Sequence, residues 1–277
     1  MRFRNKIVWI TGAGSGIGRA LAVELARNRA VIVLSGRRRE KLESVLAEIQ
    51  SLDAQGYVLP CDVTRKEELQ DAIDEIERRY KKLDIVIANA GFSVGGRVED
   101  LTQEDWRRQF DVNVFGLAQT ARCALPSLAR SGGQIVLVGS VAAFIYAEKS
   151  AAYCASKAAV HAIGETLSLE LIGTGVTCTT IHPGYVESDI SRTDNRGTLI
   201  PEKKDRRPQK LLWKSDDAAR AMLRAIASKK RVYVFTYHGK FGAFIGRVFP
   251  NMLFLLRWFL MRKRKRRISD QREQGDN

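Results

Sequence analysis

The feature of this sequence that most constrains its fold is a regular alternation between short apolar runs and longer amphipathic segments. Residues 7–10, 31–34 and 85–87 are apolar throughout, as strands buried on both faces are. Between them, a segment such as residues 40–52 places apolar side chains every three or four positions, which is the period of a helix. Strands separated by helices form right-handed βαβ units, so the sequence predicts an α/β protein with a doubly wound parallel sheet.

The alternation continues to about residue 235, with no break in composition before about residue 190, so residues 1–237 are predicted to form one domain. The further predicted strands are residues 57–59, 135–138, 176–181 and 231–235, and the further predicted helices are residues 17–28, 66–80, 105–128, 151–171 and 216–228.

Residues 188–214 differ from the rest of this domain because they are polar and contain two prolines, so they are expected to form a loop or lid. Two interpretations of their charge stay open, a solvated loop or an attraction for an anionic substrate or membrane. The basic residues concerned are Arg192, Arg196, Lys203, Lys204, Arg206, Arg207 and Lys210.

The composition is that of an ordinary folded protein with an unusual charge. The 277 residues are 45% hydrophobic and 28% charged, which excludes disorder, collagen and a polytopic membrane protein. Lys and Arg number 46 against 31 Asp and Glu, so the net charge is +15. Such a surplus points to a polyanionic neighbour, namely nucleic acid, an anionic membrane or a phosphorylated ligand.

Cysteine usage and the first residues suggest a reducing compartment. Cys61, Cys123, Cys154 and Cys178 form no C-x-x-C pair, so they are predicted to be reduced, mostly buried thiols, and no metal site is expected. The first apolar run, residues 7–10, is too short for the hydrophobic part of a signal peptide. A cytoplasmic location is therefore expected.

A glycine-rich loop lies between the first predicted strand and the first predicted helix. Gly12, Gly16 and Gly18 allow the backbone to turn tightly and to approach a pyrophosphate, while the helix N-terminus offers free N–H donors. The spacing is G-x-x-x-G-x-G and differs from the common G-x-G-x-x-G fingerprint. Ser15 and Ile17 belong to the same loop, which predicts a nucleotide site.

The end of the second strand predicts which nucleotide is bound. An acidic residue there would hold the adenosine ribose hydroxyls and repel a 2′-phosphate, but this chain has Gly36 followed by three arginines. A guanidinium pairs bidentately with a phosphate, so we expect NADP(H) rather than NAD(H), with Arg37 and Arg38 as contacts. Arg39 is interpreted as a solvated residue at the start of a helix.

Two short motifs follow the third and fourth strands. In Asp62-Val63, the carboxylate either accepts a hydrogen bond from the adenine amino group or belongs to the N-cap region ahead of the next helix; both interpretations stay open. In Asn89-Ala90-Gly91, small residues allow the cofactor to come close to the backbone.

The residues that indicate chemistry are a tyrosine, a lysine and a serine. Tyr153 and Lys157 are four apart on a predicted helix and therefore share one face. An ammonium near the phenol would lower its pKa and allow proton exchange near neutral pH. Ser140 follows the preceding strand at the carboxyl edge of the sheet, where its hydroxyl could hold a carbonyl or alcohol oxygen.

Taken together, these motifs resemble the short-chain dehydrogenase/reductase family. The matching elements are Thr11-Gly12-x-x-x-Gly16-Ile17-Gly18, Asp62-Val63, Asn89-Ala90-Gly91, Asn113, Ser140, Tyr153-x-x-x-Lys157 and Pro183-Gly184. They run in family order over residues 5–235. The resemblance implies a Rossmann-like fold with about seven parallel strands. It also implies hydride transfer between a nicotinamide cofactor and a carbonyl or alcohol, and many family members are dimers or tetramers.

The resemblance assigns roles to the catalytic residues. Tyr153 would be the general acid/base, and Lys157 would bind the nicotinamide ribose hydroxyls and lower the pKa of the tyrosine. Ser140 would position the substrate oxygen, so that Ser140 and Tyr153 both contact substrate. Asn113 would anchor a water in a proton relay through Lys157, with a helix-kinking core amide as the alternative.

The segment after Pro183-Gly184 would contact the nicotinamide carboxamide. Family members usually carry Thr four residues past this glycine, and here that place holds Ser188, which keeps the hydroxyl but lacks the methyl. Val186 would contribute through its backbone. The NADP preference makes reduction the favoured direction.

Residues 238–277 leave the family core. An apolar stretch at residues 241–261 is interrupted by Arg247, Pro250 and Arg257 and is followed by six consecutive cations at residues 262–267. This favours an interfacial helix on an anionic membrane, through residues 241–267, over a spanning one. Packing against a second subunit, as a homodimer or homotetramer, is the main alternative, and nucleic acid is the least favoured partner. The tail looks like that of membrane-associated family members that reduce lipid-like ketones.

The predicted function is NADP(H)-dependent oxidation or reduction of a hydrophobic ketone or alcohol, lipid-like or sterol-like, at a membrane surface. A soluble reductase of acyl-carrier-bound or small carbonyl compounds is the alternative within enzymes. A non-catalytic nucleotide sensor or scaffold is the alternative of another class, although such a protein need not retain the acid/base pair.

Overall fold

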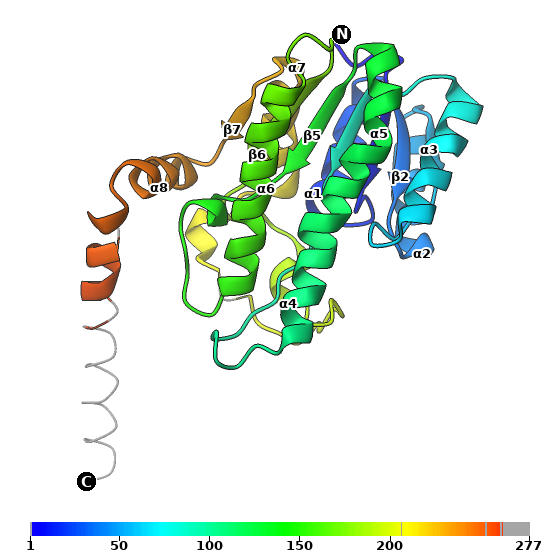
Figure 1. The fold of residues 1–277 in the computed structure, drawn as a ribbon. Coiled ribbons are helices and arrows are strands. Elements are labelled where there is room, and N and C mark those ends of the chain that lie inside the picture. The colour runs from blue at the N-terminus through cyan, green and yellow to red at the C-terminus, as the bar shows by residue number, and fades with distance from the viewer. Residues whose placement is uncertain (1, 206, 253, 261, 263–277) are drawn as a thin grey trace.

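The centre of the protein is a sheet of seven parallel strands in the order β3-β2-β1-β4-β5-β6-β7 (Figure 1). We analysed a computed structural model, which describes residues 2–205, 207–252, 254–260 and 262. The strands are β1 (Ile7–Thr11), β2 (Val31–Ser35), β3 (Gly56–Val58), β4 (Ile85–Ala88), β5 (Gln134–Val138), β6 (Thr177–His182) and β7 (Val232–Val234). The order reverses direction between β1 and β4, which leaves a crevice at the carboxyl ends of these two strands.

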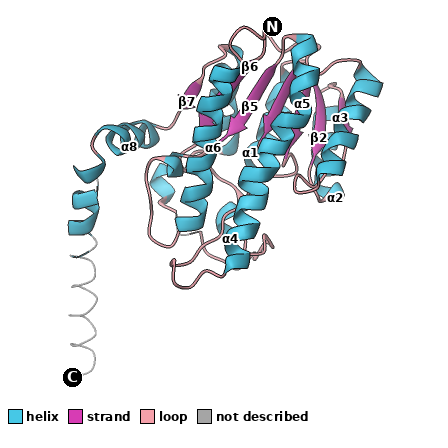
Figure 2. Cartoon of the chain, viewed as in Figure 1, coloured by secondary structure: helices cyan, strands magenta, loops and turns pink. Residues whose placement is uncertain are grey.

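Helices cover both faces of the sheet, as Figure 2 shows. One face carries α1 (Gly16–Arg27), α2 (Arg39–Gln50) and α7 (Ser215–Ala227). The other carries α3 (Lys66–Tyr80), α5 (Leu117–Ser131) and α6 (Ala151–Glu170). This three-layer arrangement confirms the predicted fold class.

Two separate apolar cores hold the three layers together because successive side chains of a strand point to opposite faces. In β1, Val8 and Ile10 pack in the core beneath α1, α2 and α7, whereas Ile7 and Trp9 pack in the core beneath the other helices. All four side chains are buried. Each strand is therefore held by packing on both of its faces, and this fixes the strand ends at which the site lies.

The predicted helix over residues 105–128 is two helices joined by a wider turn. After α4 (Gln103–Phe110), residues Asp111–Gly116 form one turn of π-helix, and α5 then begins at Leu117. Sequence periodicity does not reveal this extra residue per turn. Such turns are frequent at functional sites, and this one contains Asn113.

The last described part of the chain lies past the edge strand β7 (Figure 1). It consists of α8 (Tyr237–Val248) and a second helical segment, Pro250–Leu260, which meets α8 at an angle of 114°. In the part of the chain that the structure describes, no single helix is long and apolar enough to cross a membrane. Residues 253, 261 and 263–267 of the predicted membrane contact, and Arg206 of the lid, lie outside the described residues.

Candidate active site

A cavity of about 580 Å³ opens at the carboxyl ends of the strands. Every predicted site residue except Asn113 lines it. These residues are Gly12, Ser15, Gly16, Ile17, Gly18, Arg37, Arg38, Asp62, Val63, Asn89, Ala90, Gly91, Ser140, Tyr153, Lys157, Pro183, Gly184, Val186 and Ser188. The fold thus gathers motifs that are up to 176 positions apart in the sequence into one place.

The glycine-rich loop forms a cradle that side chains would fill. Gly12 and Gly16 have φ values of +66° and +53°, which favour glycine. A Cβ at Gly12 would lie 2.8 Å from Ala90 Cα, and a Cβ at Gly18 would overlap Gly12 O. A Cβ at Gly16 would lie 3.1 Å from Ser188 Cβ. The backbone geometry therefore fits a pyrophosphate that approaches the start of α1.

Hydrogen bonds from the end of β4 fix this loop. Asn89 Nδ2 donates to Thr11 O at 3.0 Å and to Gly12 O at 3.1 Å. In return, Thr11 Oγ1 accepts from the backbone N–H groups of Asn89 and Ala90, at 3.1 and 3.2 Å. Ser15 occupies the N-cap position of α1, but its hydroxyl makes no capping bond and stays available to a ligand.

The adenosine end of the cavity is basic. Arg37 and Arg38 are exposed, and neither guanidinium forms an ion pair with another residue that the structure describes. Arg39 differs, because it lies 3.6 Å from Glu43 in an i,i+4 pair. A free guanidinium at this place suits a phosphate on the ribose.

Asp62 has features of both roles that the sequence left open, the contact with adenine and the N-cap region ahead of the next helix. Its Oδ1 accepts from the backbone and the hydroxyl of Thr64, at 3.0 and 2.8 Å, so it stabilises the turn ahead of α3. Its backbone N–H donates to Glu68 Oε2 at 2.7 Å. The residue still lines the cavity, where its second carboxylate oxygen has no protein donor among the described residues.

Ser140, Tyr153 and Lys157 converge at the other end of the cavity. Ser140 follows β5 and lies within hydrogen-bonding reach of the Tyr153 hydroxyl. Lys157, one turn further along α6, donates from Nζ to Val138 O at 2.9 Å, and its Nζ lies 5.9 Å from the centre of the Tyr153 ring. A substrate oxygen could thus meet two hydroxyl groups at once.

The electrostatics of this group correct one expectation from the sequence. Burial raises the pKa of Tyr153, while the hydrogen bond with Ser140 and the charge of Arg207 act in the opposite direction. Lys157 is not among the causes of this shift. Burial disfavours its ammonium form and lowers the pKa of Lys157 itself to about 8. The protein alone therefore holds the phenol in its protonated form.

Asn113 does not face the cavity, because its side chain is fully buried and engaged elsewhere. Its Nδ2 donates to Phe92 O at 3.1 Å and to Ser156 Oγ at 3.2 Å, and its Oδ1 accepts from Phe92 N at 3.1 Å. The side chain thus joins the loop after β4 to α6. A water relay at this residue would have to use its backbone carbonyl.

The sequence did not single out His182, which holds the backbone of Ser140. His182 ends β6, and its Nδ1 lies 3.2 Å from Ser140 N and 3.0 Å from Ser140 O. Burial lowers the pKa of His182 to about 3, so the ring is neutral. No spacing signal marks it, because the contact arises from the register of β5 and β6.

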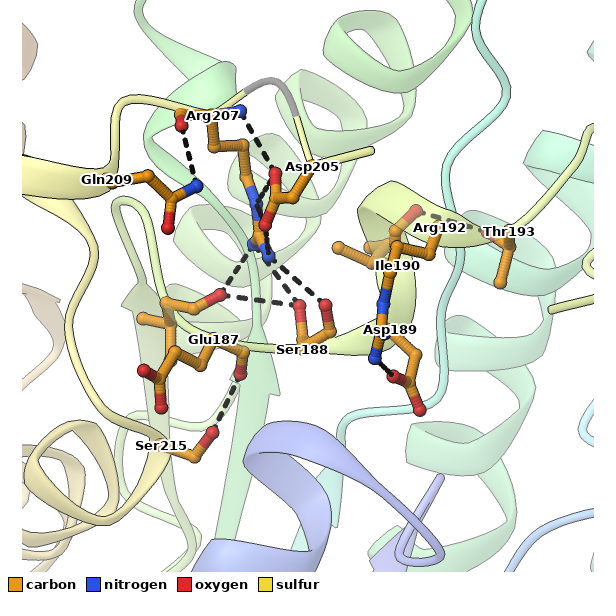
Figure 3. Close-up of polar contacts among 11 residues, drawn as sticks. Glu187, Ser188, Asp189, Ile190, Arg192, Thr193, Asp205, Arg207, Gln209 and Ser215 are labelled. Carbon is orange, nitrogen blue, oxygen red and sulfur yellow. Dashed lines mark hydrogen bonds and ion pairs between the residues drawn. The ribbon is translucent and has the colours of Figure 1, made fainter. Parts of the chain in front are cut away.

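Arg207 was interpreted only as one cation of a basic loop, but it connects the lid to the cofactor end of the site. It pairs with Asp205, with Nη2 2.7 Å from Oδ2, and it donates to the backbone oxygens of Val186 and Ser188 at 2.6 and 3.1 Å (Figure 3). This pairing lowers the pKa of Asp205 to about 2. Arg207 therefore fixes the segment expected to contact the carboxamide.

The cavity also has apolar lining residues, and the C-terminal helices contribute to its wall. Its apolar lining residues are Phe92, Val141, Ala142, Ile145, Ala147, Ile190 and Leu199. His238, in the first turn of α8, stacks on Tyr185 with ring centres 5.5 Å apart. Arg257, from the second C-terminal helical segment, also lines the cavity. Neither His238 nor Arg257 was predicted to line the site, because both come from outside the family core.

Comparison with protein families identifies the chain. The family described as short chain dehydrogenase matches residues 6–198. An uncharacterized oxidoreductase of Staphylococcus aureus is 38% identical over 231 residues, which are 83% of this chain and 94% of the relative.

Solved structures with the same fold bind both nicotinamide cofactors. A short-chain dehydrogenase/reductase from Burkholderia phymatum, in complex with NAD, is 25% identical with a TM-score of 0.77, covering 84% of this chain and 90% of that one. An alcohol dehydrogenase from Thermococcus sibiricus, complexed with 5-hydroxy-NADP, is 26% identical with a TM-score of 0.72, covering 84% and 97%. A 3-ketoacyl-ACP reductase from Sinorhizobium meliloti is 31% identical with a TM-score of 0.72, covering 83% and 96%.

Proposed function

Because the chain belongs to the short-chain dehydrogenase/reductase family, we propose that it is an NADP(H)-dependent oxidoreductase that interconverts a hydrophobic ketone and its alcohol. The observation that carries the proposal is the convergence of Ser140 and Tyr153 in the cavity that the glycine loop also lines. The apolar residues in the lining of that cavity support a hydrophobic substrate.

In the direction of reduction, NADPH held by the glycine-rich loop, Arg37 and Arg38 would supply the hydride for the carbonyl carbon. Ser140 and Tyr153 hold the carbonyl oxygen, and the Tyr153 hydroxyl gives it a proton as negative charge develops. The raised pKa of Tyr153 keeps the phenol protonated before the reaction. Lys157 lines the same cavity, and its pKa of about 8 allows it to exchange a proton near neutral pH.

The choice of NADP(H) is supported by the two exposed guanidinium groups after β2. Gly36 stands where a carboxylate would repel a 2′-phosphate, and Arg37 and Arg38 face the cavity. A bidentate guanidinium–phosphate pair gives specificity as well as affinity.

Replacing Tyr153 by Phe tests the reaction. In Tyr153→Phe the proton donor is lost, so kcat for NADPH-dependent reduction of a ketone should fall by at least about 10²-fold, while NADPH binding stays within about threefold. Initial rates and a fluorescence titration of NADPH measure the two quantities. Tyr146→Phe, at an exposed tyrosine before the same helix, is the matched control. Wild-type turnover in Tyr153→Phe would remove the assignment.

Replacing both arginines tests the cofactor. The double variant Arg37→Ala and Arg38→Ala should lower kcat/KM for NADPH by about 10²-fold and leave kcat/KM for NADH almost unchanged, since only NADPH carries the 2′-phosphate. Arg39→Ala, whose side chain pairs with Glu43, is the control. If wild-type enzyme uses NADH better than NADPH, the cofactor proposal is wrong.

A second candidate is reduction of an acyl-carrier-bound ketone. It is favoured by the likeness to the 3-ketoacyl-ACP reductase of Sinorhizobium meliloti and by the basic surface, which would suit an acidic carrier protein. Rates with an acyl-carrier thioester and with a free long-chain ketone discriminate between the two. A non-catalytic sensor would bind NADPH but would not oxidise it with any of the ketones tested.

A further inference from the structure

The small residues of helix α8 face the protein, whereas its large apolar residues are exposed to solvent. Gly239 and Ala243 are buried against the protein. Tyr237, Phe241 and Phe244 are 82%, 70% and 58% exposed. Their spacing of four and three residues, continued by Val248, places them on one face of the helix. A helix of a soluble monomer would bury this face, so the exposed stripe indicates a partner.

The helical segment that follows exposes apolar side chains on more than one face. Phe254, Leu256 and Phe259 are 66%, 57% and 61% exposed. Together with α8 they give exposed apolar side chains on both helical segments that lie past the edge strand β7 (Figure 1). We call it the C-terminal docking surface; its residues are Tyr237, Phe241, Phe244, Val248, Phe249, Met252, Phe254, Leu255, Leu256, Trp258, Phe259 and Leu260.

Positive charge accompanies this apolar surface. Lys240 is exposed on α8, and the Arg262 guanidinium lies 5.0 Å from the Trp258 ring centre. The sequence continues with five more cations at residues 263–267, and the two C-terminal helices contain no acidic residue. Apolar residues interleaved with cations, including a tryptophan, match the boundary between acyl chains and anionic headgroups.

We propose that the C-terminal docking surface binds the face of an anionic lipid bilayer. Neither described helix alone is long enough to span a bilayer, and the 114° bend between the two lets both lie in the boundary region. A second copy of this chain is a poorer occupant. A two-fold contact would bring the same cations of both copies together, whereas anionic lipids neutralise them.

The position of the surface extends the proposed function, on which this step rests. His238 lies on α8 and Arg257 on the second helix, and both also line the active-site cavity. The bilayer-facing helices therefore form part of the wall of the substrate chamber. A ketone dissolved in the bilayer would reach the Tyr153 hydroxyl through this cavity, which His238, Arg257 and Tyr153 all line. The substrate class is then a lipid ketone with an acyl chain.

Co-sedimentation of the full chain with vesicles tests the docking surface without relying on turnover. Vesicles of phosphatidylcholine with phosphatidylglycerol should bind the wild type at least about tenfold more strongly than pure phosphatidylcholine vesicles, and high salt should weaken the binding. The double variant Phe241→Ser and Phe244→Ser should lose at least about tenfold in binding. Leu169→Ser with Ile172→Ser, at exposed apolar residues in and just after the last turn of α6, is the matched control and should bind like the wild type.

Two further measurements separate the possible failures. If the wild type does not bind anionic vesicles, the docking proposal is wrong. If the Phe241/Phe244 variant changes the mass in solution and leaves vesicle binding unchanged, the docking proposal is wrong and the surface joins two copies. NADPH oxidation with a small water-soluble ketone reports on the proposed function alone and should be the same in wild type and variant. With a long-chain ketone in vesicles, the variant should be slower by about the loss of binding. Equal rates there would contradict delivery from the bilayer.

Discussion

At the residue scale, Arg207 links the lid to the segment after Pro183-Gly184 and to the cavity. Its guanidinium holds Asp205 and the backbone oxygens of Val186 and Ser188, and it faces the cavity as well. We regard it as a positioning residue that keeps the carboxamide-binding segment in place.

Removal of Arg207 should therefore weaken cofactor binding more than chemistry. Arg207→Ala is expected to raise the Kd of NADPH by about tenfold, since charged hydrogen bonds of this kind contribute about 1.5–3 kcal/mol. Fluorescence titration measures this, and kcat at saturating NADPH should fall by less. Arg207→Lys should recover only part of the affinity, because an ammonium lacks the planar fork. Arg192→Ala, which removes a pair with Asp189 alone, is the control. An unchanged Kd in Arg207→Ala would show that the lid does not support the site.

Single residues also show what the sequence could tell. The glycines, Tyr153 and Lys157 follow from spacing along one strand, loop or helix, and such local spacing is visible in the sequence. His182 and Arg207 follow from contacts between distant elements, such as the register of β6 against β5. Local spacing carries no such information, so both roles emerge only from the packed structure.

At the element scale, α8 depends on a close approach to the loop after β5. A Cβ at Gly239 would lie 2.8 Å from Val141 Cγ1 and would overlap the hydroxyl of Thr236, which caps the helix. Arg247 adds a contact at the other end of α8, with its guanidinium 4.3 Å from the Phe144 ring centre. The helix is thus held at both ends.

Gly239→Ala reverses the usual effect of such a change. In a helix, Gly to Ala normally stabilises by about 1 kcal/mol. Here the added methyl has no room, so the free energy of unfolding should fall by about 1–3 kcal/mol, measured by urea denaturation. Lys240→Ala, at an exposed position of the same turn, should change it by less than about 0.5 kcal/mol. A more stable Gly239→Ala protein would mean that α8 is not packed as described.

The elements of the fold were largely predictable. Helices and strands were placed to within about three residues because apolar periodicity reports burial directly. The π-helical turn at Asp111–Gly116 was not, since one extra residue in a turn leaves the periodicity of a long helix nearly intact. The 114° bend between the C-terminal helices also escaped prediction, although Pro250 marks its place.

At the scale of the whole molecule, the buried Lys157 couples folding stability to pH. Its pKa is lowered from 10.5 to about 8 in the folded protein because burial disfavours the ammonium. Between these two values the unfolded chain binds more protons than the folded one, so the free energy of unfolding rises with pH.

Comparison with Lys157→Met isolates this effect. The free energy of unfolding of the wild type minus that of Lys157→Met should increase by about 2 kcal/mol between about pH 7.5 and about pH 9.5. Urea denaturation at a series of pH values measures the difference. Lys66→Met, at an exposed lysine, should give a difference that does not depend on pH. A flat difference for Lys157→Met would show that the ammonium is solvated.

The arrangement of the strands has a practical consequence for work on this protein. The N-terminal residues lie at the end of the sheet opposite the cavity (Figure 1). There Arg2 Nη1 donates a hydrogen bond to Ala227 O at 2.8 Å. The opposite terminus continues from the helices that border the substrate chamber. An affinity tag or fluorescent label attached ahead of Arg2 should leave catalysis and vesicle binding untouched, whereas the same label at the other terminus would compete with both.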